Sequence, residues 1–242
     1  LPHLWADERC GLVQARWDHV NLKQSWLTRV QAMGIDGHFV IEQTARNRNG
    51  LFMNFCGTAG VWRRAAIDDS GGWEHDTVTE DLDLSYRAQL RGWRFHYLPN
   101  VLVPAELPPT YSAFKSQQYR WAKGTIQTAR KLLPTVWRAP LPIFNKLQAT
   151  VHLTRYALNL QMALIAVLLL PLMLSLGDAG VWFYRSVVFL CLLVPAAIGP
   201  SLGYMVCQYY EHPESWKTRL MSLPFLLVVG FGICLSNGKA VI

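Results

Sequence analysis

The short acidic segment Thr79-Glu80-Asp81 is the first candidate for chemistry in this sequence. A carboxylate at an exposed turn can take the proton from a sugar hydroxyl as that hydroxyl attacks an anomeric carbon. The segment stands where a helix is expected to begin, and a helix N-terminus lowers the pKa of a nearby carboxyl group and weakens it as a base. Partial desolvation by the acceptor would have to offset this effect. Acidic residues also stabilise a first helical turn without any catalytic role, so the segment alone is ambiguous.

A second segment, Gln117-Gln118-Tyr119-Arg120-Trp121, lies in a basic stretch that is expected to be helical. Gln117, Arg120 and Trp121 share one face, because residues three and four apart are neighbours in a helix. The indole offers a flat apolar face that suits the C–H face of a pyranose ring. The guanidinium can hold diphosphate oxygens as a leaving group gains charge. An amphipathic helix with a buried Trp and a solvated Arg would carry the same residues for packing alone.

A third segment, Phe55-Cys56-Gly57-Thr58, is predicted to be a strand end followed by a tight turn, which the glycine permits. Short apolar runs predict strands at residues 12–16, 51–55, 95–98 and 101–103. Helices are expected at 22–46, 80–91 and 111–133, the second with a capping box formed by Thr77 and Glu80, and the third ending before Pro134. Short strands that alternate with helices predict an α/β domain.

Charge is distributed unevenly along the 242 residues. The net charge is +7, yet no acidic residue occurs between Glu106 and Asp178, where eight Lys and Arg lie. Such a stretch can bind anionic lipid headgroups, a diphosphate or nucleic acid. Nucleic acid is the least favoured of these, because the stretch leads into apolar segments and lacks interleaved aromatic platforms. The five cysteines are scattered without a CxxC pair, so they indicate neither a disulfide framework nor a zinc site. A reducing compartment is therefore expected.

Three apolar segments, residues 157–176, 187–206 and 220–236, are predicted to be membrane helices. The third is the weakest, since it contains Pro224, Gly230 and Gly232. Aromatic residues near the segment ends are typical of membrane interfaces. A buried helix pair in a soluble protein is the alternative. The basic residues before the first segment place the preceding domain on the cytoplasmic side.

These features predict three parts of the chain. Residues 1–134 form an α/β domain on the cytosolic side. Residues 135–155 mix Trp137, Phe144 and Leu147 with Arg138 and Lys146, and are expected to lie along the membrane surface. Residues 156–242 carry the transmembrane helices.

Together the three segments resemble the family 2 inverting glycosyltransferases, especially the processive membrane enzymes. This group includes cellulose synthase, the cellulose-synthase-like mannan and glucan synthases, hyaluronan synthase and chitin synthase. The order is similar, with Phe-Cys-Gly-Thr, then Thr-Glu-Asp, then Gln-x-x-Arg-Trp, then apolar helices. Linking stretches such as Gly71-Gly72-Trp73 also resemble the family, so that the similarity covers nearly the whole chain.

The resemblance implies an A-type, Rossmann-like α/β glycosyltransferase fold, of which residues 1–134 are the C-terminal part. It implies Asp81 as the catalytic base, in a motif shared with Glu80 and Thr79. It implies that residues 55–58 line the acceptor end and that Trp121 stacks on the terminal sugar of the growing chain. Gln117 and Arg120 would then lie near the donor diphosphate.

A divalent metal, Mg²⁺ or Mn²⁺, is also implied, to neutralise the departing diphosphate. Val13-Gln14-Ala15-Arg16-Trp17 looks like the strand that follows the metal-binding Asp-x-Asp of the family. Asp81-Leu82-Asp83 has the same spelling, but its helical context matches the base motif instead. The metal ligands are therefore expected upstream of Leu1, and this stretch of chain by itself is expected not to transfer sugar.

The function that the resemblance implies is hexosyl transfer from a nucleotide sugar, UDP-glucose or GDP-mannose. The acceptor would be the non-reducing end of a growing β-linked glucan or mannan. Synthesis would occur at the cytoplasmic face of the cell (inner) membrane, among membrane lipids, with export through several membrane helices. A lipid glycosyltransferase that adds one sugar is the closest alternative. A non-catalytic scaffold or transporter subunit is the other, although it would have no chemical need for the Thr-Glu-Asp and Arg-Trp motifs.

Overall fold

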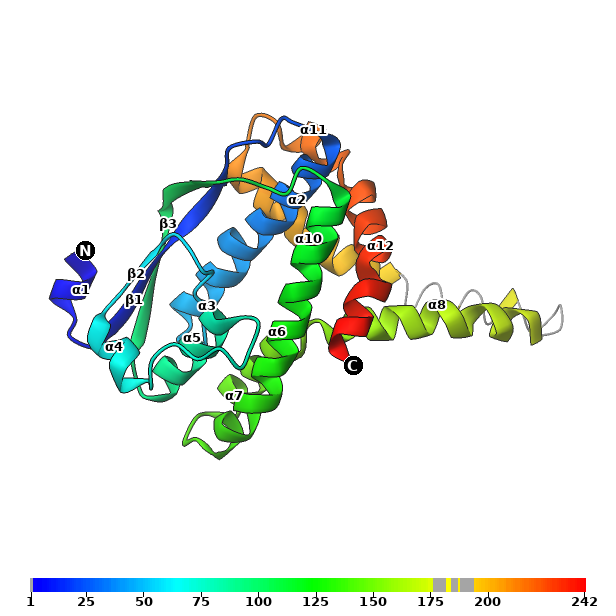
Figure 1. Cartoon of the computed structure of the whole chain (residues 1–242). Coiled ribbons are helices and arrows are strands. Elements are labelled where there is room, and N and C mark those ends of the chain that lie inside the picture. The colour runs from blue at the N-terminus through cyan, green and yellow to red at the C-terminus, as the bar shows by residue number, and fades with distance from the viewer. Residues whose placement is uncertain (1, 176–181, 184–186, 188–193) are drawn as a thin grey trace.

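The computed structural model describes residues 2–175, 182–183, 187 and 194–242. Its sheet has three strands in the order β2-β1-β3, where β1 is Cys10–His19, β2 is Gly60–Trp62 and β3 is Arg94–Ala105. The central strand β1 runs antiparallel to β2 and parallel to β3, and its first seven residues are buried. A mixed sheet among many helices confirms the predicted α/β character of this part of the chain (Figure 1).

The strand β3 differs from the prediction of two short strands. It is one strand of 12 residues that contains Pro99. Its pairing with β1 shifts at this point, because Ala15 faces Leu98 whereas the next residue, Arg16, faces Leu102. Pro99 has no N–H to donate, and the bulge leaves it unpaired with β1. The strand can therefore continue past this proline.

The first long helical stretch is divided into three. The helix α2 (Trp26–Asp36) begins with a capping box between Ser25 and Thr28. It continues as a π-helix, η1 (Gly37–Gln43), and then as α3 (Thr44–Arg48). The sequence predicted this helix from its apolar spacing but not its π-helical middle. Such wide turns are rare and are often found at functional sites.

The segment predicted as a strand at residues 51–55 has no regular secondary structure in the described chain. Side chains bind its backbone instead. Gln89 donates to the Met53 carbonyl over 2.6 Å and accepts from the Met53 N–H over 3.0 Å, and the Phe55 N–H donates to Ser85 Oγ over 2.8 Å. The buried backbone groups are therefore satisfied without a strand partner.

The helices α5 (Glu80–Leu90) and α6 (Tyr111–Arg138) carry the two motifs of the predicted site. The predicted capping box of α5 is wrong, because its N-cap is Thr79, whose hydroxyl lies 3.5 Å from that of Thr128. The predicted end of α6 before Pro134 is also wrong. Leu132 and Val136 are buried on either side of this proline in a cluster with α5 and α7 (Ile143–Thr154). That packing outweighs the hydrogen bond that a proline removes from a helix.

The remaining elements surround this core. The short helices α1 (Pro2–Ala6) and α4 (Arg64–Asp69) flank the sheet. The long helix α6 runs between the α5 side of the molecule and α12 (Leu223–Val241), while α8 (Ala157–Ser175) projects outward (Figure 1). α10 (Val194–Glu211) and α11 (Trp216–Leu220) lie close to α2.

Among the described residues, Trp216–Val241 is the one helical stretch whose length and apolar composition would suffice to cross a membrane. It contains the third predicted membrane segment, which the sequence had marked as the weakest. The first predicted segment coincides with α8 as a helix. Most of residues 187–193, where the second begins, lie outside the described residues. Several membrane spans therefore remain a prediction.

Candidate active site

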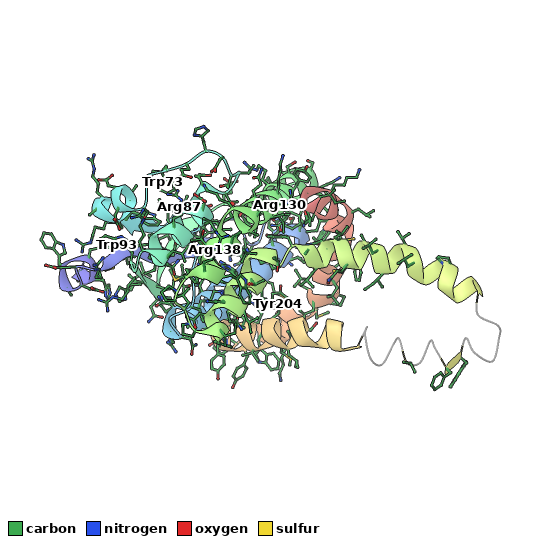
Figure 2. All side chains as sticks on the ribbon, turned by 90° about the horizontal axis from the view of Figure 1, so that it is seen from below. Trp73, Arg87, Trp93, Arg130, Arg138 and Tyr204 are labelled. Carbon is green, nitrogen blue, oxygen red and sulfur yellow. The ribbon has the colours of Figure 1, made fainter. Side chains whose placement is uncertain are left out.

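A cavity of about 630 Å³ lies between α2 and η1 on one side and α6, α10 and α12 on the other. Five of the ten predicted site residues line it: Cys56, Thr79, Asp81, Gln117 and Trp121. They come from the loop before β2, the start of α5 and the middle of α6, three places far apart in the sequence. Tyr204 of α10, which is labelled in Figure 2, also lines the cavity. The fold therefore brings the acidic motif and the Gln-x-x-Arg-Trp motif to one space.

The other five predicted residues lie elsewhere. Gly57, Thr58, Glu80 and Arg120 are exposed to solvent outside the cavity lining. Phe55 is buried below the turn, with its ring edge-on to Trp62 at 5.9 Å between centroids. The expected shared face of α6 thus holds for Gln117 and Trp121, whereas the guanidinium of Arg120 points to solvent.

Asp81 has the electrostatics that a general base requires. Burial, assisted by the charge of Glu80, raises the pKa of the Asp81 carboxyl to about 6. The N–H of Leu82 donates to Asp81 Oδ1 over 2.8 Å and opposes this shift. Burial by the protein therefore raises the pKa of Asp81 more than the hydrogen bond at the helix N-terminus lowers it. A carboxyl group with this pKa is ionised at neutral pH and still basic enough to accept a proton.

The turn at Gly57 comes directly up to Asp81. Gly57 has a φ of +77°, and a Cβ at this position would lie 3.2 Å from Asp81 Oδ2. A side chain here would be strained by the backbone and would crowd the carboxylate. The predicted glycine turn after Cys56 is confirmed, and the glycine is needed both for its backbone conformation and for its approach to Asp81.

Gln14, which the sequence analysis did not select, holds this turn in place. Its side chain is fully buried in β1 and donates to the carbonyls of Thr58 and Ala59, each over 3.0 Å. The Cys56 N–H donates back to Gln14 Oε1 over 3.1 Å. The available signal was an amide in the middle of an apolar buried strand, because a buried polar group needs partners.

Ser85 links the same loop to the acidic motif. Its hydroxyl donates to the Asp81 carbonyl over 2.6 Å and accepts from the Phe55 N–H over 2.8 Å. The residue is fully buried within α5. The acidic motif and the loop that precedes the turn are therefore attached to one hydroxyl group.

The helix α6 contacts the acidic motif through small and polar residues. A Cβ built at Gly124 would lie 2.5 Å from side-chain atoms of Thr79 and 2.7 Å from its backbone nitrogen. The Val78 N–H donates to Gln127 Oε1 over 3.0 Å. Gly124 follows Trp121 by three residues, so this contact sets the indole beside the start of α5. A glycine in mid-helix was the sequence signal for such a close approach.

The opposite wall of the cavity is charged, and the π-helix η1 supplies it. Glu42 lines the cavity together with His38, whose Nδ1 lies 2.8 Å from the carboxylate. Arg46 donates to Glu42 over 2.9 Å, and Arg155 lies 3.4 Å away. Burial opposes the shift, yet His38, Arg155 and His152 hold the pKa of Glu42 well below its usual range. Glu42 is therefore an anion that can accept hydrogen bonds but cannot supply a proton.

The thiol of Cys56 is kept neutral. Burial, and then the charge of Asp81, raise the pKa of Cys56 to about 12. Gln43 of η1 lies 3.5 Å from its sulfur. A protonated thiol is a weak nucleophile. Cys56 can line a substrate but does not suit covalent catalysis.

Comparison with known proteins assigns the chain to a family. Residues 2–199 match the family described as Glycosyl transferase family group 2. The chain belongs to this family. The expected resemblance is thereby confirmed, and with it the assignment to a family of transferases.

The family includes relatives of high identity. The chain is 46% identical over 138 residues to glucomannan 4-beta-mannosyltransferase 2 of Arabidopsis thaliana, which covers 57% of this chain and 26% of the relative. It is 42% identical over 153 residues to glucomannan 4-beta-mannosyltransferase 1 of Oryza sativa subsp. japonica, which covers 60% and 29%. The chain thus spans less than a third of the length of these curated relatives.

The divalent metal that the family implies finds no suitable ligand set among the described residues. One trio of carboxylates, Glu74, Asp76 and Asp83, is close enough to suggest a metal. However, the Lys131 ammonium lies among them, 2.9 Å from Asp76 and 3.0 Å from Asp83. These residues lie outside the cavity lining and already hold a cation, so they do not fit a metal at the donor diphosphate. Asp83 faces Lys131, whereas Asp81 lines the cavity.

Proposed function

We propose that this chain carries the acceptor and base half of an inverting hexosyltransferase that extends a β-linked polysaccharide. The observation that carries the proposal is the shared cavity of Asp81 and Trp121, with the pKa of Asp81 raised by burial to about 6. Membership of Glycosyl transferase family group 2 supports the reaction class.

In the proposed reaction, the terminal sugar of the acceptor stacks on Trp121 and places one hydroxyl at Asp81. The carboxylate takes the hydroxyl proton while the oxygen forms a bond to the anomeric carbon of the donor. The bond from that carbon to the nucleotide diphosphate breaks, and the diphosphate leaves with its electron pair. One displacement from the opposite face inverts the anomeric configuration. The neutral thiol of Cys56 supports a single step without a covalent enzyme intermediate.

The names of the relatives favour a mannan product. Both are glucomannan 4-beta-mannosyltransferases, which supports GDP-mannose as donor and a β-mannan or glucomannan as product, with UDP-glucose and a β-glucan as the second choice. We also propose a requirement for Mg²⁺ or Mn²⁺, whose ligands lie among residues other than those described here.

The membrane part of the proposal rests on the wall of the cavity. Leu226, Val229 and Ile233 of α12 line it, and α12 belongs to the stretch that is long and apolar enough to cross a bilayer. A polymer that leaves Trp121 would therefore meet a candidate membrane helix. We propose a cytosolic domain (1–134), an interfacial segment (135–155) and several membrane helices (156–242) in the cell membrane, with catalysis on the cytoplasmic side.

The interfacial segment is supported by the outer face of α7. Ile143, Phe144, Leu147 and Val151 are each about half exposed or more, while Ala149 and Leu153 are buried against α5 and α6. One apolar face is thus packed and a second is open to a lipid surface. The same surface also favours the alternative, a transferase that adds one sugar to a membrane lipid.

The test uses full-length protein in membranes with radiolabelled GDP-mannose or UDP-glucose. The proposal expects label from GDP-mannose in a long, alkali-stable carbohydrate chain that a β-mannanase degrades. Label in a lipid-extractable monoglycoside would support the lipid acceptor instead. No incorporation from any nucleotide sugar by correctly folded full-length protein would overturn both.

A further inference from the structure

Three carboxylates surround one ammonium group beside the acidic motif. Glu74 and Asp76 come from the loop before α5, Asp83 from the first turn of α5, and Lys131 from α6. Lys131 Nζ lies 2.9 Å from Asp76 and 3.0 Å from Asp83 and also contacts Glu74. The arrangement has the carboxylates of a divalent cation site, but a side chain of the same chain fills it.

The burial of Asp83 makes the ammonium necessary. Its side chain is fully buried, and a buried carboxylate is stable only with partners that compensate its charge. Arg87 supplies one partner at 2.7 Å, but it lies on the same helix, one turn further on. Lys131 supplies the partner from α6. Although burial lowers it, the three carboxylates raise the pKa of Lys131 above its ordinary value, so the group stays charged.

Lys131 continues a stripe of contacts between α6 and the acidic motif. Gly124 touches Thr79, Gln127 accepts from the Val78 N–H, and Thr128 lies at the Thr79 hydroxyl. Positions 124, 127, 128 and 131 share one face of a helix, as does Trp121 three residues earlier. The stripe therefore begins at the indole that lines the cavity and ends at the ammonium that holds the loop and the first turn of α5.

We propose that Lys131 is a positioning residue for the sugar transfer. By holding Glu74, Asp76 and Asp83, its ammonium fixes the start of α5 against α6 and so sets the Asp81 carboxylate at the correct distance from a sugar on Trp121. This inference rests on the proposed function, because it assigns Asp81 and Trp121 the roles of base and acceptor platform. Lys131 itself touches neither substrate nor reacting atoms.

The Lys131→Met variant removes the charge and leaves the three carboxylates to repel one another. A displacement of about 1 Å between reacting groups can cost on the order of 100-fold in rate. We expect kcat of the full-length protein in membranes to fall about 10- to 100-fold, with little change in KM for the nucleotide sugar. Lys131→Arg keeps a cation and should restore most of the rate. Lys123→Met is the matched control, since Lys123 is exposed on the same helix.

A chemical rescue separates positioning from general stabilisation. Lys131→Ala leaves room for a small primary ammonium ion, and added ethylammonium should raise its kcat in a dose-dependent manner while the control variant does not respond. Asp76→Asn offers a milder test, because Asp76 is more than half exposed and its loss leaves Asp83 paired. It should lower kcat several-fold without loss of folded protein.

The outcomes are distinct. An unchanged kcat for Lys131→Met would overturn the proposal, and so would a loss that neither Arg nor ethylammonium restores. If the wild type incorporates no sugar, the proposed function fails independently. The clamp, that is Lys131 with its three carboxylates, would then be tested by limited proteolysis of the loop at residues 71–79. Lys131→Met should make this loop easier to cut, and Lys131→Arg should not. Equal cleavage of the wild type and Lys131→Met would reject the clamp as well.

Discussion

Gly124 of α6 lies against Thr79 so closely that a Cβ on the glycine would come within 2.5 Å of the threonine side chain. Real Cβ atoms do not approach other atoms at this distance, so a side chain at 124 must push the two helices apart. Thr79 precedes Asp81 by two residues, and Trp121 precedes Gly124 by three. The distance between the proposed base and the proposed sugar platform therefore depends on the absence of one methyl group.

Gly124→Ala should consequently damage activity more than stability. Intrinsic helix propensity favours Ala over Gly by about 1 kcal/mol, which offsets part of an overpacking cost of about 1–3 kcal/mol. The rate of sugar incorporation should fall about 10- to 100-fold, because the start of α5 moves. Initial rates and thermal unfolding of the full-length protein check this. Lys123→Ala serves as the control on an exposed neighbouring position, and a wild-type rate for Gly124→Ala would refute the close contact.

The pH dependence of the reaction follows from Asp81. Burial raises the pKa of this carboxyl to about 6, and only the ionised form can accept a proton. The rate of sugar transfer should therefore fall tenfold per pH unit below about 6 and level off above about 7. Initial rates of the wild type between pH 4.5 and 8, at saturating donor, would measure this. A rate that stays constant down to pH 4.5 would exclude this carboxyl as the base.

Asp81→Asn should also stabilise the folded protein at neutral pH. The carboxyl has a pKa of 3.8 when unperturbed and about 6 when folded, so the folded state disfavours its ionised form. The unfavourable contribution is complete above pH 6 and disappears as pH falls through the interval from about 6 to 3.8. Asn avoids it, and we expect a gain of about 1–3 kcal/mol at pH 7.5 that shrinks at pH 4.5. Thermal unfolding in detergent at the two pH values tests the sign, and a less stable variant at pH 7.5 would contradict it.

Local signals were sufficient to predict several elements. The apolar run around Leu12 predicted the buried strand β1, and the residues around Glu80 and Gly92 predicted α5 to within one residue. The gathering of Asp81 with Trp121 could be expected only from the resemblance to a family. Nothing in the spacing of 40 residues between them requires the two to meet.

The errors have a common cause, since each involves partners distant in sequence. Residues 51–55 have the composition of a strand, but Ser85 and Gln89, 30 and 36 residues from their partners, bind their backbone instead. Pro134 has the signal of a helix end, but burial of Val136 against α7 carries α6 past it. Gln14 and Lys131 were missed for the same reason, because each binds a loop that is distant in sequence.

The most direct test of the account is sugar incorporation by full-length Asp81→Asn in membranes, with binding of the radiolabelled donor measured in parallel. Asp68→Asn is the matched control, because this carboxylate is largely exposed and pairs with an exposed Arg64. We expect Asp81→Asn to lose polymer synthesis by at least about 100-fold while it binds the donor as the wild type does, and Asp68→Asn to keep both properties. Undiminished polymer from Asp81→Asn would show that this carboxylate is not the base.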